Sequence, residues 1–316
     1  MIDPASSSNY GYTNATADER GTLVVQHTAV RRVRLSWMDR GGRVTGVAAD
    51  GLQMLSGALS PDGKRLAYSG LDPRDLFVLD LASGVATRIT FENRLVNSVV
   101  WSPDGRTIAF ARSTEAGWKV YTKGADGTGA ESLLFPGTGM FNYPESWSKD
   151  GRWLLARSAD ESGGFDLWKI PIGGGAAEVY QRTPAREMRA SLSPDGRWVV
   201  YLAEADGKSE LYVQAFPTPG PKYQVSFPDP AGATWSSDDE ILVGNRRGEF
   251  FSVQVSTAGG FRQGSTSRLF AIPAPDFPVD VSPDRKSFLV GSVTNRQTLS
   301  HLEVVLNWPR LIEKGK

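Results

Sequence analysis

The sequence SPDGRTIAF, from Ser102 to Phe110, decides the fold, because closely related phrases recur along the whole chain. The six clear copies are 42 to 46 residues apart and begin at Ser60, Ser102, Ser148, Ser193, Ser236 and Ser282. Forty-three residues before Ser60, at Ala17, the segment ADERGTLVV keeps the pattern without its proline and glycine. All copies have an acidic residue at the third position and an apolar residue at the seventh, which indicates seven structural repeats.

Each phrase has the composition of a tight turn between two strands. Serine, proline, aspartate and glycine suit successive positions of such a turn, and β-rich runs stand on both sides of it. A second pair of β-rich runs follows in most repeats, as in residues 75–90. No long stretch places apolar residues at the spacing of a helix. We therefore expect each repeat of about 44 residues to form four antiparallel strands.

Four-stranded units repeated at this interval are typical of the blades of a β-propeller. Seven copies predict an all-β, seven-bladed propeller over residues 12–308, with a flexible leader at 1–11 and a tail at 309–316. Only 34 residues follow Ser282, however, which allows three strands of a last blade, the third at 301–306. The alternative is a six-bladed ring, in which the degenerate first copy forms no blade and the N-terminal segment completes the last one.

The composition excludes several classes of function. Lysine plus arginine and aspartate plus glutamate number 35 each, so no overall basic field attracts nucleic acid or anionic membranes. The chain has no cysteine, and its two histidines, His27 and His301, cannot build a histidine-rich metal site. No window is apolar enough for a spanning helix. We expect no cofactor, no metal, no nucleic-acid partner and no membrane insertion by this chain.

Catalytic motifs are also missing from the sequence. Gly207-Lys208-Ser209 lacks the first glycine of a phosphate-binding loop, which would stand at Leu202. Neither the protein-kinase motifs nor a Gly-x-Ser-x-Gly elbow occurs. The acidic run 238–240 is interpreted as a solvated turn rather than a calcium site. The chain is therefore expected not to be an enzyme. Three tryptophans that precede their turns are expected to pack between blades: Trp101, Trp147 and Trp235.

With the repeats laid out, the chain resembles the TolB-like class of propeller repeats, whose mark is this Ser-Pro-Asp-Gly turn. Four stretches further resemble the C-terminal propeller of bacterial, especially acidobacterial, membrane-anchored serine/threonine protein kinases: 34–43, 189–226, 279–290 and 303–308. The resemblance implies a periplasmic or extracellular sensing or docking domain tied to a cytoplasmic kinase. This sequence contains no kinase domain, no membrane span and no α/β domain ahead of the propeller as in TolB itself. Neither the activity of the full-length kinases nor that of TolB is therefore carried over to this chain.

Candidate binding residues lie in the segments that lead into the innermost strands, because a ring of blades brings one such segment per blade to the channel mouth. Their mixed charge favours a protein, a peptide or a small polar ligand. The candidates are Asn97, Tyr143, Glu145, Glu187, Arg189 and Asp280. Two other hypotheses remain open: a hydrolase or lyase that uses carboxylates at the mouth, and a scaffold that holds proteins on its side or rim.

Overall fold

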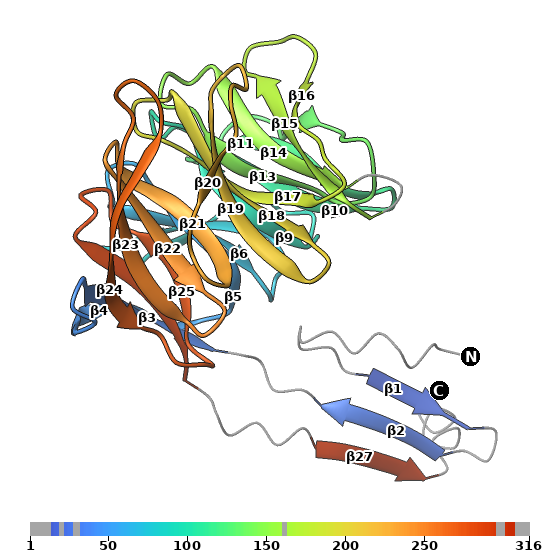
Figure 1. Ribbon diagram of the computed structural model, residues 1–316. Helices are drawn as coiled ribbons and strands as arrows, with labels where there is room; N and C mark the ends of the chain where they lie inside the picture. Colours follow the sequence, from blue (N-terminus) through green and yellow to red (C-terminus); the bar gives the residue numbers. More distant parts are fainter. Residues whose placement is uncertain (1–13, 19–21, 28–31, 160–162, 295–300, 307–316) are drawn as a thin grey trace.

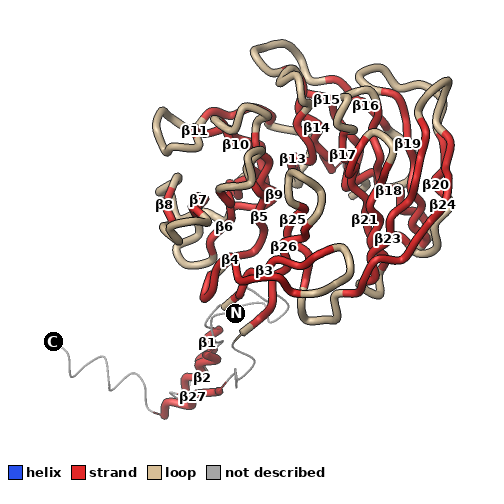
Figure 2. The backbone as a smooth tube through the Cα atoms, turned by 90° about the vertical axis from the view of Figure 1, so that its left-hand side faces the viewer, coloured by secondary structure: helices blue, strands red, loops and turns tan. Residues whose placement is uncertain are grey.

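The computed structural model describes residues 14–18, 22–27, 32–159, 163–294 and 301–306. Six four-stranded antiparallel sheets form the blades of a propeller, and a three-stranded sheet lies outside the ring (Figures 1 and 2). These residues contain strands and connections only, so none of them belongs to a helix that could cross a bilayer.

The blades follow the chain, each running from its innermost to its outermost strand. Blade 1 consists of β5 (Met54–Leu59), β6 (Arg65–Gly70), β7 (Leu76–Asp80) and β8 (Ala86–Arg88). Blade 2 consists of β9 (Val96–Trp101), β10 (Thr107–Thr114), β11 (Gly117–Gly124) and β12 (Ser132–Phe135). Blade 3 consists of β13 (Asn142–Trp147), β14 (Trp153–Ala159), β15 (Phe165–Pro171) and β16 (Glu178–Gln181).

The later blades repeat this plan until the ring closes. Blade 4 consists of β17 (Arg186–Leu192), β18 (Trp198–Ala205), β19 (Lys208–Ala215) and β20 (Tyr223–Val225). Blade 5 consists of β21 (Pro230–Ser237), β22 (Glu240–Asn245), β23 (Glu249–Ser256) and β24 (Arg262–Ala271). Blade 6 joins two distant parts of the chain: β25 (Phe277–Val281), β26 (Ser287–Val293), β3 (Val33–Asp39) and β4 (Val44–Leu52).

The prediction of seven blades is wrong, and the six-bladed alternative describes the ring. The degenerate copy at Ala17 contributes β1 (Asn14–Ala17) and β2 (Thr22–His27), which pair with β27 (His301–Leu306) in the outer sheet. That copy lacks the proline and glycine of the turn, and strand β27, expected as the third strand of the last blade, pairs outside the ring. Its place beside β26 is taken by β3, whose Val33 and Leu35 are fully buried.

Five of the six Ser-anchored turns share one hydrogen-bond pattern. In blade 2, Ser102 Oγ donates to Asp104 Oδ1 at 2.6 Å, and Arg106 N donates to the same oxygen at 3.0 Å. Thr107 N in turn donates to Ser102 Oγ at 2.9 Å. These hydrogen bonds hold the pKa of Asp104 below its usual range. The same three bonds recur in the turns that begin at Ser60, Ser148, Ser193 and Ser282.

The second strand of each blade is apolar on both sides because both sides are covered by other blades. In β10, Ile108 and Phe110 pack towards blade 1, whereas Ala109 packs towards blade 3. One such hydrophobic cluster fills each of the six interfaces between blades, and the smallest lies between blades 5 and 6. Trp101, Trp147 and Trp235 belong to these clusters, which confirms their expected role.

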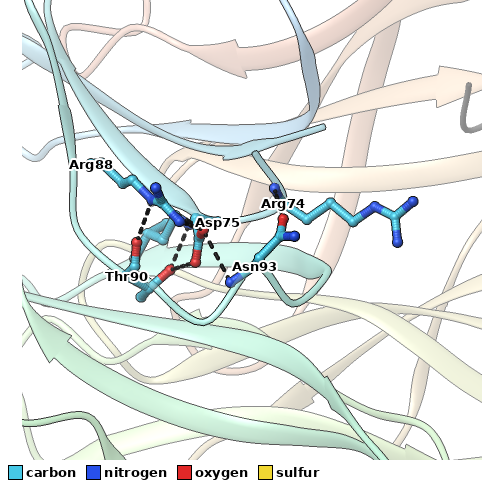
Figure 3. Close-up of polar contacts among 6 residues, drawn as sticks. Arg74, Asp75, Arg88, Thr90 and Asn93 are labelled. Atoms are coloured by element: carbon cyan, nitrogen blue, oxygen red, sulfur yellow. Dashed lines mark hydrogen bonds and ion pairs between the residues drawn. The ribbon is translucent and has the colours of Figure 1, made fainter. Parts of the chain in front are cut away.

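A polar contact fastens the outer strands of most blades. Figure 3 shows it in blade 1, where the Asp75 carboxylate faces Arg88, Thr90 and Asn93. Asp75 Oδ2 accepts from Arg88 Nη2 at 2.5 Å, and Asp75 Oδ1 accepts from Thr90 Oγ1 at 2.6 Å. The Asp75 side chain is only 1% exposed, so these partners replace the water that its carboxylate would otherwise bind. Asp166 and Arg182 make the matching pair in blade 3, with 2.6 Å between Oδ2 and Nε.

Replacing Asp75 tests how much this buried contact stabilises the fold. The Asp75→Ala variant leaves Arg88 and Thr90 without their acceptor, and we expect it to lower the free energy of unfolding by roughly 3 kcal/mol in urea denaturation. Asp50→Ala is the control, because the Arg34–Asp50 pair joins the corresponding outer strands of blade 6, β3 and β4. Both of its side chains are about half exposed. Equal losses in the two variants would contradict the role assigned to burial.

The closing glycine of the turn gives a second prediction. Gly196 has a φ of 71°, and a Cβ added there would meet no atom within 4 Å. Gly196→Ala should therefore destabilise the protein by about 1 kcal/mol through backbone strain alone. Gly220→Ala is the matched control, because its Cβ would make an ordinary 3.5 Å contact with Ala215 at a φ outside the left-handed region. Denaturation midpoints that shift equally in both variants would refute this explanation.

Candidate functional site

The two faces of the ring differ in the connections between strands that lie on them. The Ser-Pro-Asp-Gly turns lie on one face, here called the turn face. The connections between blades, and those between the second and third strands of a blade, lie on the opposite face, here called the loop face. The predicted binding residues occupy innermost strands that start at the loop face.

Asp280 ties the last blade to the first. Its Oδ2 accepts a hydrogen bond of 2.7 Å from Leu59 N in blade 1, and its Oδ1 accepts one of 2.7 Å from Val281 N. Burial raises the pKa of Asp280, and the two N–H groups oppose that rise. Ser146 makes a similar tie at the same position of blade 3, where its Oγ accepts from Leu192 N at 3.2 Å. Asp280 therefore has a structural role in closing the ring.

Tyr143 and Glu145 surround the guanidinium of Arg157. Glu145 is ion-paired with Arg157, whose guanidinium lies 4.6 Å from the centre of the Tyr143 ring and 5.5 Å from that of Phe165. The Trp118 ring packs against Tyr143 with 5.7 Å between the ring centres. The carboxylate of Glu145 is thus held by a neighbouring strand of its own blade.

Glu187 is the most deeply buried of the predicted residues, with no exposed surface. Thr183 donates a hydrogen bond to its Oε1, while Oε2 has no partner among the residues that the structure describes. Burial raises the pKa of Glu187, hydrogen bonds with Thr183 oppose that rise, and the smaller effects of Asp166 and Lys222 act in opposite directions. Asn97 is half-buried and accepts a hydrogen bond from Ser98 N at 2.7 Å.

A cavity of about 630 Å³ opens on the loop face between blades 5 and 6. Its walls come from the innermost strands β21 and β25 and from the connections at 245–248 and 272–276. Arg189 and Asp280 both line this cavity, so the structure brings these two predicted residues to one place. Asn97, Tyr143, Glu145 and Glu187 do not line it.

Small side chains explain why the cavity forms at this interface. β21 contributes Ala231, Gly232 and Ala233, which line the cavity together with Val279 and Val281 of β25. The position just before the turn is Val281 in blade 6, whereas the other blades have a leucine or tryptophan there: Leu59, Trp101, Trp147, Leu192 and Trp235. The smallest hydrophobic cluster of the ring leaves the loop-face end of this interface open.

The same interface is fastened at its other end. Arg40, in the connection between β3 and β4, is ion-paired with Glu240 at the start of β22, and its Nη1 donates to Glu240 Oε2 at 3.1 Å. Both residues lie at the turn face. Glu240 thus ties blade 5 to blade 6, which corrects the interpretation of residues 238–240 as a solvated turn. The interface is therefore fastened at the turn face, whereas the cavity opens at the loop face.

The charged residues around the cavity are not equally available. Arg246 is paired with Glu204 at 3.2 Å and with Asp229 at 3.3 Å. Arg189 is exposed, and within the described part of the chain it has no hydrogen bond, ion pair or ring contact. Its side chain lies over Gly232, where an added Cβ would come within 3.2 Å of Arg189 Cδ. Arg247 is likewise exposed, lines the cavity and has no ion pair among the described residues. The site therefore presents apolar walls and two available guanidinium groups.

The sequence analysis missed the residues that create the cavity, although a signal for them exists. The run Ala231-Gly232-Ala233 and the small Val281 stand in columns that bulkier residues fill in other repeats. His27 and His301 face each other across the ladder of β2 and β27, and their side chains lie outside the described part of the structure. No group of three or more potential metal ligands occurs among the described residues.

The raised pKa of Glu187 predicts how stability depends on pH. The folded chain binds the Glu187 proton more tightly than the unfolded chain does, so this stabilisation is full below the pKa of the unfolded carboxyl and is lost as pH rises through the folded pKa. Glu187→Gln, which stays neutral, should therefore gain stability relative to wild type in urea denaturation as pH rises above the usual pKa of a glutamate carboxyl.

Asp104→Asn is the control for this measurement, because the pKa of Asp104 is lowered instead of raised. The stabilisation from this carboxylate is full above the unfolded pKa and is lost on acidification, so Asp104→Asn should lose stability relative to wild type as pH rises. Slopes of the same sign in the two variants would disprove the assignment.

Comparisons with known proteins agree with this architecture. The family model described as TolB beta propeller domain matches residues 18–243. The uncharacterized protein Atu1656 of Agrobacterium fabrum is 26% identical over 148 residues, which are 46% of this chain and 49% of that protein. The chain thus matches about half the length of this curated relative.

Solved structures show the same fold at low sequence identity. A structure assigned to TolB of Agrobacterium tumefaciens aligns with a TM-score of 0.65 and 18% identity, covering 84% of this chain and 99% of the other. TolB of Acinetobacter baumannii aligns with a TM-score of 0.56 and 18% identity, covering 77% and 65%. The resemblance found in the sequence is confirmed at the level of the propeller family, and the chain belongs to the TolB β-propeller domain family.

Proposed function

We propose that this propeller is a non-catalytic binding domain that takes a protein, a peptide or a small polar ligand at its loop face. The observation that carries the proposal is the cavity between blades 5 and 6, which combines apolar walls with the available guanidinium of Arg189. Pockets of this volume and composition are typical of ligand sites. A net charge of zero supports a ligand other than nucleic acid.

The arrangement of the carboxylates favours binding over catalysis. Glu145 is held by Arg157, and Asp280 accepts two backbone N–H groups. Glu187 is fully buried and does not line the cavity. A hydrolase or lyase at the channel mouth would use a pair of free carboxylates. Asp276 and Asp280 both line the cavity, but Asp280 is engaged by the two backbone N–H groups.

The finer proposal is a sensor or interaction domain of a receptor-like serine/threonine kinase, located in the periplasm or outside the cell. It rests on the sequence resemblance of four stretches, of which 189–226 and 279–290 contribute to the cavity through Arg189 and Asp280. The stretches that resemble the kinase propellers thus supply residues of the candidate site.

A peptide-binding experiment tests the proposed function. A synthetic library of random pentapeptides is incubated with the full chain, and bound peptides are identified by mass spectrometry. We expect a subset to bind and to lose at least about tenfold in affinity to Ala231→Phe, which fills the cavity. Ala82→Phe is the control, because Ala82 is exposed in a turn-face connection of blade 1. Peptides that bind wild type and Ala231→Phe equally well would exclude the cavity as the site.

A further inference from the structure

The repeats of the chain act as an internal comparison for the residues around the cavity. Four positions before each Ser-anchored turn, the innermost strands have Ser56, Ser98, Pro144, Arg189, Gly232 and Pro278. Arg189 is the only charged member of this column. Ser98 and Arg189 share a left-handed backbone, with φ values of 48° and 55°, so this conformation belongs to the bulge in the strand. The long cationic side chain is what distinguishes blade 4.

The guanidinium of Arg189 has no carboxylate beside it within the described residues, whereas several arginines of the ring are ion-paired. Arg40, Arg88, Arg157 and Arg182 each pair with a carboxylate of the chain. Arg189 has no such partner within the described residues, although it lines a cavity. A guanidinium presents a planar fork of donors that matches a carboxylate in two parallel hydrogen bonds. The guanidinium of Arg189 is therefore available to an anion in the cavity, and Arg247 adds a second positive charge to the lining.

The backbone around the cavity offers hydrogen-bonding groups as well. The ladder of β21 with β22 skips Ala231, and the ladder of β25 with β26 skips Val279. A bulged residue is left out of the regular hydrogen bonds between its strands. Both bulged residues line the cavity, on its two opposite blades. Main-chain groups at these bulges suit the amide groups of a peptide.

The fixed charges of the cavity select among anions. Asp276 and Asp280 also line it, and the charge of Arg246 is balanced by Glu204 and Asp229. Two available cations, Arg189 and Arg247, beside two carboxyl groups leave no net positive charge, which favours a ligand with a single negative charge over the nearly double charge of a phosphate. The small apolar walls favour small apolar side chains next to that charge.

We propose that this cavity binds a peptide through one carboxylate, which pairs with Arg189, while the adjoining residues of the peptide fill the space between β21 and β25. This inference rests on the proposed function and names the ligand class of the same site. The carboxylate belongs either to the C-terminus of a peptide or to an acidic side chain within it. Arg189 is the specificity-determining residue of the site.

Four synthetic probes test the proposal by isothermal titration calorimetry with the full chain. The first is acetyl-Ala-Val-Ala-Val with a free C-terminal carboxylate, and the second is the same peptide as its C-terminal amide. The third and fourth are amides that carry one glutamate or one phosphoserine in place of the second alanine. Wild type should bind at least one of the two carboxylate peptides about tenfold or more tightly than the neutral amide. Whether the first or the third probe binds decides between a chain end and a side chain.

Arg189→Asn should remove this preference, because asparagine tolerates the left-handed backbone and lacks the cation. Arg94→Asn is the matched control, because Arg94 is an exposed arginine of another connection on the loop face. It should keep the preference. Thermal denaturation of both variants shows whether each is folded, and Arg189→Lys, which keeps the charge without the fork, should recover only part of the preference.

The results separate this inference from the proposed function. Equal affinity for acid and amide, lost in Ala231→Phe, would overturn the role of the carboxylate and leave the cavity as a peptide site. Tighter binding of the phosphoserine peptide than of either carboxylate peptide would also overturn it. If these probes and the pentapeptide library all fail to bind, both proposals fall.

Discussion

Ring closure depends on the ladder between β26 and β3, which joins segments from opposite ends of the sequence. Val33 and Leu35 of β3, together with Leu289 of β26, pack into blade 1, while Phe288 and Val290 pack against blade 5. Because this one sheet supplies half of two interfaces, the core beside blade 1 and the hydrophobic cluster beside blade 5 are complete only once the two segments have paired. The repeated blades alone would leave the ring open.

The sequence predicts what is local and fails where distant segments compete. The turns were predictable because Ser102, Asp104 and Thr107 complete their hydrogen bonds within six residues. The number of blades was not, because the choice of β3 over β27 as the partner of β26 is made by pairing across more than 200 residues. In the candidate site, position relative to the turn singled out Arg189 and Asp280, and the structure brings both to the cavity. Position alone could not show that Arg157 engages Glu145.

The site illustrates how a repeat protein creates a difference between equivalent interfaces. Wherever a tryptophan or leucine precedes the turn, the interface is filled, and polar side chains of the innermost strands join neighbouring blades, as Ser146 and Asp280 do. Between blades 5 and 6, a run of small residues leaves the loop-face end of the interface unfilled, whereas Arg40 and Glu240 join the two blades at the turn face. A cavity is thus obtained without loss of contact between the blades.

The outer sheet of β1, β2 and β27 has a mechanical consequence. β2 leads into the start of β3 and β27 follows the end of β26, so both connections leave blade 6 at the same end of one antiparallel pair. A force that separates the two ends of the chain therefore acts on this pair in the unzipping direction, in which hydrogen bonds are loaded one after another instead of together. After the ladder of β2 with β27 had separated, tension would split blade 6 between β26 and β3, before it disturbed the continuous blades 1 to 5.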